Sequence, residues 1–199
     1  MKNIISYLVI ATIAFTACNS GNNKSTTSEN ASIDTARAKT QTADTSTANL
    51  PVVDAKNANK EILTAYLQLK NAFASDNSND AAASATILQT GFKNFNKTTL
   101  SAQQQKIFED IKGEANEHAE HIGKNGGNNA HQREHFEMLS KDIYDLVKAF
   151  GAGQVLYKDF CPMYNHNKGA FWISETKEIS NPYLGKAMPT CGTVKEEIK

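Results

Sequence analysis

Four of the five histidines lie within eighteen positions, in two pairs spaced three and four residues apart. These spacings place the members of each pair on one face of a helix. Both pairs lie within about two helical turns of Gly126-Gly127, so a helical hairpin that turns there brings them to the same end. A methionine three residues beyond the last histidine extends the second row. The candidate ligands of this cluster are His118, His121, His131, His135 and Met138.

Imidazoles with a thioether can bind a transition metal, and Zn²⁺ is one candidate for the histidine cluster. The alternative is structural. His118 falls on an apolar stripe and suits a helical core, whereas His131 and His135 lie one step off the core face and suit solvent. Both interpretations stay open at the level of the sequence.

A second candidate cluster joins a cysteine to a methionine twice, in Cys161-Pro162-Met163 and in Met188-Pro189-Thr190-Cys191. Thiolate and thioether are soft ligands that favour Cu(I) or Ag(I) over hard cations, and His166 could add a nitrogen. The alternative is a disulfide between Cys161 and Cys191, worth roughly 3–4 kcal/mol and natural in an oxidising compartment. A disulfide alone leaves both methionines unexplained, and the sequence does not separate the two interpretations.

The segment from His131 to His135 also matches H-x-x-E-H, in which two helical histidines hold zinc and the glutamate, here Glu134, acts as the base. That chemistry needs a third ligand and a substrate cleft as well. Near Cys161 and Cys191, no set of nucleophile, base and orienting group is evident. We therefore expect no enzymatic activity and keep a zinc-dependent protease as a minor alternative.

The composition excludes some classes of function. The 199 residues carry 21 Lys and Arg against 21 Asp and Glu, with no basic run, so the electrostatic footprint of a nucleic-acid binder is missing. Gly126-Gly127 is followed by two asparagines and lacks the ending of a phosphate-binding loop. We expect no nucleic-acid partner.

The N-terminus predicts export. Residues 1–17 have one lysine and a mostly apolar run that is too short to span a membrane, as in a signal peptide. Small residues before Cys18 resemble the lipobox of bacterial lipoproteins, which implies cleavage there and a lipid on the Cys18 thiol. Residues 18–51 are rich in Ser, Thr and Asn and predict a disordered tether. We expect a lipoprotein anchored to a membrane of the cell envelope and facing the periplasm.

Residues 52–153 predict a mainly α fold, an antiparallel four-helix bundle. Ser101 and Gln104 form a capping-box pattern at the start of the third helix, and Asn129 is the expected N-cap of the fourth. Residues 154–199 predict an irregular segment packed on the bundle, with a short strand at Ala170-Phe171-Trp172-Ile173. The four apolar stripes are Ile62, Tyr66, Leu69 and Phe73; Ile87 or Leu88, Phe92 and Phe95; Phe108, Ile111, Ala115, His118 or Ala119, and Ile122; and Phe136, Leu139, Ile143, Leu146 and Phe150.

The segments around Cys161-Pro162-Met163, Phe171-Trp172-Ile173 and Met188-Pro189-Thr190-Cys191 resemble a bacterial family of domains of unknown function, with the resemblance covering about residues 55–199. Its members are envelope lipoproteins, and the domain also occurs joined to periplasmic adaptor subunits of copper/silver-type efflux systems. The resemblance implies metal handling, with Cys161, Met163, Met188 and Cys191 as the ligands and the histidines second.

The sequence therefore predicts a periplasmic lipoprotein that binds Cu(I) or Ag(I) and buffers it or delivers it to an efflux adaptor. The competing prediction is a disulfide-closed helical module of the cell envelope. Such a module would bind a protein partner through Phe171, Trp172 and Tyr183 and would hold no metal.

Overall fold

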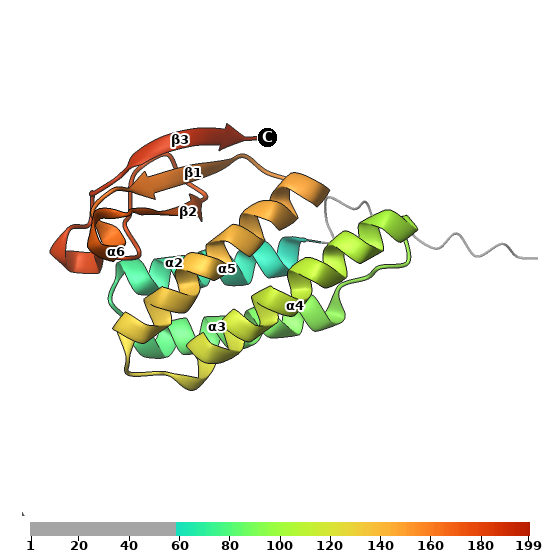
Figure 1. Cartoon of the computed structure of the whole chain (residues 1–199), viewed down its shortest axis with the longest axis horizontal. Coiled ribbons are helices and arrows are strands. Elements are labelled where there is room, and N and C mark those ends of the chain that lie inside the picture. The colour runs from blue at the N-terminus through green and yellow to red at the C-terminus, as the bar shows by residue number, and fades with distance from the viewer. Residues whose placement is uncertain (1–58) are drawn as a thin grey trace, which may run out of the picture. The chain divides into compact units, whose positions relative to one another are not determined.

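The computed structural model describes residues 59–199. The signal peptide over residues 1–17, the lipidation site at Cys18 and the tether over residues 18–51 lie outside the described residues. The predicted mainly α fold is confirmed: four long helices pack against one another in sequence order, and a small antiparallel sheet follows them (Figure 1). In the described part of the chain, no helix is long and apolar enough to cross a membrane.

The four helices follow the apolar stripes. They are α2 (Lys60–Ala74), α3 (Ser78–Asn94), α4 (Ala102–Lys124) and α5 (Asn129–Phe150). On α3 the buried member of the predicted pair is Leu88, whereas Ile87 is 54% exposed. The stripe therefore runs through Leu88.

Local capping signals place the helix ends. The predicted capping box at α4 is present, because Ser101 accepts the amide of Gln104 and the Gln104 side chain accepts the amide of Ser101. The predicted N-cap of α5 is wrong by one residue: Asn128, rather than Asn129, accepts the amide of His131. The Asn129 side chain instead donates to the carbonyl of Asp76 and ties the start of α5 to the end of α2.

Aromatic side chains fill the core at both ends of the helices. At one end, Phe95 stacks on Phe108 with 4.0 Å between ring centroids, and the ring of Phe150 packs against both. At the other end, Phe136 stacks on Tyr66 and meets Phe73 edge-on. Pairs of this kind stabilise a core beyond the area that they bury.

The C-terminal segment is more regular than predicted. It forms three strands in the order β2-β1-β3, with β1 (Leu156–Cys161), β2 (Ala170–Ser174) and β3 (Thr193–Ile198) all antiparallel. Only β2 was predicted. The buried side of β1 carries Asp159 and is interrupted by a bulge, and β3 carries three charged residues, so neither strand shows a clean apolar alternation.

The sheet packs on α2 and α5 through polar as well as apolar contacts. The hydroxyl of Tyr66 accepts the amide of Ile173 at 3.1 Å and contacts Ser140 Oγ at 2.8 Å, which joins α2, α5 and β2 at one buried point. Lys70, only 1% exposed, forms an ion pair with Glu175 at 2.7 Å. These contacts hold the sheet on the helices. Two short helices lie in the connections between the strands: α6 (Tyr164–Asn167) follows β1, and η1 (Gly185–Ala187) precedes β3.

Candidate metal centre

The connection between α4 and α5 is a tight turn held by hydrogen bonds of the Gln132 and Ser78 side chains. Gly127 has a φ of 93°, a conformation that favours glycine. The side chain of Gln132, fully buried, donates to the carbonyls of Ile122 and Ser78 and accepts the hydroxyl of Ser78. The Ser78 hydroxyl also accepts the amide of Gly127. This network fixes the end of α4 against the start of α5.

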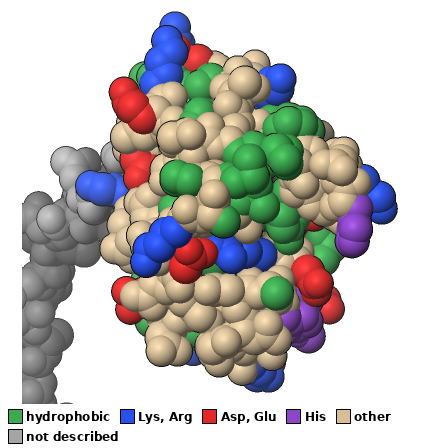
Figure 2. All heavy atoms as spheres, turned by 90° about the vertical axis from the view of Figure 1, so that its left-hand side faces the viewer, with side chains coloured by type: hydrophobic (Ala, Val, Ile, Leu, Met, Phe, Trp, Pro, Cys, Tyr) green, Lys and Arg blue, Asp and Glu red, His purple; other side chains and the backbone are tan. Residues whose placement is uncertain are grey.

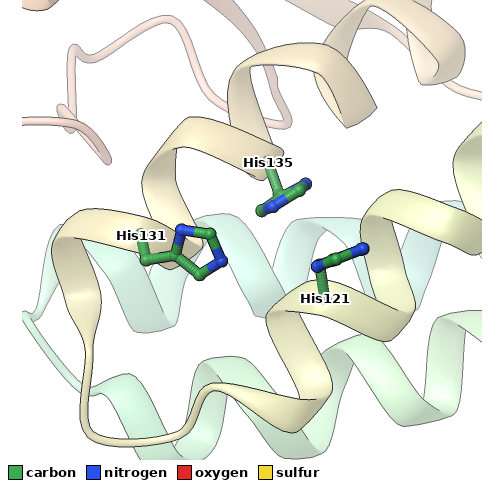
Figure 3. A group of neighbouring side chains, drawn as sticks. All are labelled: His121, His131 and His135. Atoms are coloured by element: carbon green, nitrogen blue, oxygen red, sulfur yellow. The ribbon is translucent and has the colours of Figure 1, made fainter. Parts of the chain in front are cut away.

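The hairpin brings three histidines together, as the spacing predicted. The ligand nitrogens of His121, His131 and His135 all lie within 4.8 Å of one another. Figure 3 shows His121 projecting from α4 toward His131 and His135, which project from α5 into the same space. The rings of His121 and His135 stack, with centroids 4.3 Å apart. Nitrogens around one zinc ion stand about 3.4 Å apart, so small side-chain rotations would suffice to close this set on an ion.

His118 adjoins this group without belonging to it. Its Nδ1 lies 3.3 Å from Nδ1 of His135, and its ring is partly buried between the helices. Burial lowers the pKa of His118, and burial followed by the positive charges of His121 and His131 lowers the pKa of His135. Both shifts favour the neutral imidazole, which is the form that binds metal.

Glu134 is the carboxylate nearest to the cluster along α5. Its Oε2 lies 3.3 Å from Nδ1 of His131. A carboxylate on the second ring nitrogen fixes the tautomer and orientation of a metal-binding imidazole. From the sequence, Glu134 was predicted only as the base of a protease motif. Its contact with His131 was not predicted, although the i,i+3 spacing of the two residues on a helix indicates it.

Met138, the fifth predicted member, is exposed and lines a groove beside the histidines. The groove has a volume of about 640 Å³ and runs between α5 and α6, with Glu134, Glu137 and Tyr164 in its walls. His166, also predicted as an additional ligand, lies on the α6 side of this groove and not with the other histidines. No ligand nitrogen of His166 belongs to the group of three.

The two cysteines meet as well. Sγ of Cys161 lies 3.0 Å from Sγ of Cys191, and both thiols are free. The thiol of Cys161 is fully buried, whereas that of Cys191 is partly accessible. The hydrogen bond with Cys161, followed by burial, raises the pKa of the Cys191 thiol.

Met163 and Met188 lie beside the cysteine pair at the surface. Met163 is 49% exposed and Met188 is 39% exposed. The amide of Cys191 donates to the carbonyl of Met188, which holds that methionine next to the pair along the chain. Figure 2 views the end of the molecule where α6 and η1 lie and shows hydrophobic side chains gathered there, with histidines beside them.

The aromatic surface predicted for a protein partner does not form as expected. Trp172 is fully buried and Tyr183 is 2% exposed, and Phe171 is the one of the three that reaches solvent. The hydroxyl of Tyr183 donates to the carbonyl of Phe171, inside the packing of sheet on helices. Packing explains the difference: β2, which carries Trp172, packs on α2 and α5, and Tyr183, which follows β2, packs against Trp172 and against Phe136 of α5.

Residues 62–155 match a family described as "Protein of unknown function (DUF3347)". The match confirms the resemblance to a domain of unknown function over the four helices. It includes all four clustered histidines and ends before β1, so both cysteines and Met163 and Met188 lie beyond it. No curated protein and no solved structure is significantly similar to the chain.

Proposed function

We propose from the site itself that this protein, whose residues 62–155 match a family described only as of unknown function, binds a divalent transition metal. The ligands are His121, His131 and His135. The observation that carries the proposal is the approach of their nitrogens to within 4.8 Å of one another across the α4–α5 hairpin. Imidazole nitrogen suits Zn²⁺ and Cu²⁺, which we take as the probes, as well as iron and nickel.

The arrangement of the three histidines favours reversible metal binding. Three protein nitrogens leave at least one coordination position open, unlike the four-ligand set of a structural zinc site. His121 is exposed, and His131 and His135 are partly exposed, so a ligand from solvent or from a partner protein reaches the ion. The hairpin is held by Gln132 and Ser78, so the fold does not depend on the ion. These features support buffering or delivery.

A second candidate function is binding of Cu(I) or Ag(I) at the cysteine pair. The contact between the thiols of Cys161 and Cys191 supports it, because two adjacent thiolates suit a soft monovalent ion. Met163 and Met188, which are close to Cys161 and Cys191 along the chain, are exposed, and their thioethers are further soft donors. The raised pKa of Cys191 means that the ion must displace a proton from its thiol.

The cellular setting that we propose rests on the sequence. A lipid on Cys18 would anchor the protein to a membrane of the cell envelope, and the tether would hold the helical domain in the periplasm. Delivery of the metal to an efflux adaptor is the corresponding partner interaction. We propose neither an enzymatic activity nor a nucleic-acid partner for this protein.

The test of the histidine site is competition for Zn²⁺ and Cu²⁺ against a chromophoric chelator, using protein without a histidine tag. We expect one equivalent of metal bound, and an affinity at least about tenfold lower in His121→Gln and His131→Gln. The matched control is His166→Asn, which removes an exposed histidine outside the group and keeps a residue that tolerates the left-handed backbone there. Equal loss in the control, or no binding by the parent protein, refutes the proposal.

The test of the cysteine site is a Cu(I) competition titration of the reduced protein. We expect binding that Cys191→Ser abolishes and that Met188→Leu weakens, while Met138→Leu has no effect. Unchanged Cu(I) affinity in Cys191→Ser refutes the second candidate and leaves the cysteines as a disulfide-forming pair.

A further inference from the structure

The interface between α4 and α5, called the seam below, continues beyond the histidines. The contact between His118 and His135 shows which residues of the two helices lie opposite each other. Their Nδ1 atoms lie 3.3 Å apart, so position 118 of α4 faces position 135 of α5. The helices run antiparallel around the hairpin. Glu114 lies one turn from His118 toward the start of α4, and Asp142 lies two turns from His135 toward the end of α5. Both therefore lie along the same seam as His118.

Asp142 is unusual for an acidic residue. It is 7% exposed, and its buried Oδ2 has no hydrogen-bond partner among the protein groups. A buried carboxylate without a partner is costly, and buried polar atoms in proteins are nearly always satisfied. His135 lies two turns earlier on the same face of α5 and contacts His118 of α4, so Asp142 lies on the side of α5 that faces α4. The unpaired oxygen of Asp142 therefore indicates that a binding partner from outside the protein occupies the seam.

The charges around Asp142 favour a cation as that partner. Burial, followed by the negative charges of Glu114 and Asp145, raises the pKa of the Asp142 carboxyl to about 7. Lys141 is the nearby cation, but its ammonium lies 3.7 Å from Glu137 on the groove side of α5. Glu114 is exposed and has no ion-pair partner among residues 59–199. Two carboxylates thus share the seam without a paired positive charge.

We propose that Glu114, His118 and Asp142 form a second cation site in the α4–α5 seam, separate from the group of three histidines. One imidazole nitrogen and two carboxylates form a donor set for Mn²⁺, Fe²⁺ or Zn²⁺, harder than the all-nitrogen group. Glu114 is long and exposed, so its carboxylate swings into the seam when the ion binds. The site stands on its own residues and does not depend on metal at His121, His131 and His135.

Mn²⁺ is the probe that distinguishes the two sites, because it prefers carboxylate oxygen over a set of imidazoles. We expect an electron paramagnetic resonance titration of the full protein to show one bound Mn²⁺. Asp142→Asn keeps the shape of the side chain, and Glu114→Gln changes an exposed residue. Each should weaken Mn²⁺ binding at least about tenfold. His131→Gln should leave it unchanged, which separates this proposal from the function proposed above.

The matched control is Asp145→Asn, which removes an exposed carboxylate from the same turn of α5. Thermal unfolding of each variant without metal confirms that it folds. Three results overturn the proposal: no Mn²⁺ binding by the parent protein, binding that survives both Asp142→Asn and Glu114→Gln, or an equal loss in Asp145→Asn. Loss of Mn²⁺ binding in His131→Gln would assign the ion to the histidine group instead.

Discussion

The hydroxyl of Tyr66 joins three elements at one buried point, and removing it in Tyr66→Phe tests how the sheet is held on the helices. The hydroxyl is fully buried, accepts the amide of Ile173 and contacts Ser140 Oγ. Phenylalanine fills the same space but leaves the amide of Ile173 and the hydroxyl of Ser140 without this partner. Each buried group left without a partner costs about 1–3 kcal/mol, so we expect a total loss of about 2–6 kcal/mol in the free energy of unfolding.

Urea unfolding followed by the fluorescence of Trp172 measures this loss. Trp172 is the single tryptophan of the chain and is fully buried on β2, so its emission reports on the contact of the sheet with the helices. The midpoint should fall while the slope of the transition stays the same. Because the two oxygens interact directly, Tyr66→Phe and Ser140→Ala should not be additive in the double variant.

Tyr144→Phe is the matched control for Tyr66→Phe. The hydroxyl of Tyr144 donates to Glu196 near the surface, where water replaces the lost partner. We expect its removal to cost less than about 1 kcal/mol. The reasoning is refuted if the two Tyr→Phe variants lose equal stability, because the buried hydroxyl would then have no special role in joining α2, α5 and β2.

Two further predictions concern other contacts of the fold. Asp76 accepts a hydrogen bond from Arg133 that holds the pKa of its carboxyl below 3.8, so its contribution exists at neutral pH and disappears as the pH falls through the lowered value. Asp76→Asn should cost about 1 kcal/mol at neutral pH, and acid titration of unfolding midpoints should show the difference shrinking below pH 3.8. Oxidation should join Cys161 and Cys191, whose thiols are in contact, and raise the free energy of unfolding by about 3–4 kcal/mol over the reduced protein. Mass spectrometry of alkylated protein checks the bond, and equal urea midpoints with and without reductant would contradict the expected gain.

Local patterns in the sequence predicted the helices and much of the histidine cluster. The stripe from Ile62 to Phe73 and the capping box at Ser101 depend on residues three and four positions apart, and such spacings determine a helix face without reference to the rest of the chain. The same rule placed His131 and His135 on one helix face, and the turn predicted at Gly126-Gly127 brought them to the same end as His118 and His121. For this reason the clustering of the histidines was predictable in outline.

Contacts between distant segments decided the features that residue spacing does not determine, namely how the helices are rotated against each other and how the strands pair. Helical spacing does not give the rotation of α4 against α5, so only the packed structure shows that His121 joins His131 and His135. His118 instead faces the seam that Asp142 shares. The charged strand β3 pairs only because β1 offers it a partner, and Trp172 is buried only because β2 packs on α2 and α5. The sequence by itself determined which residues share a helix face, and the tertiary structure decided which faces meet, because burial and pairing depend on groups far apart in the chain.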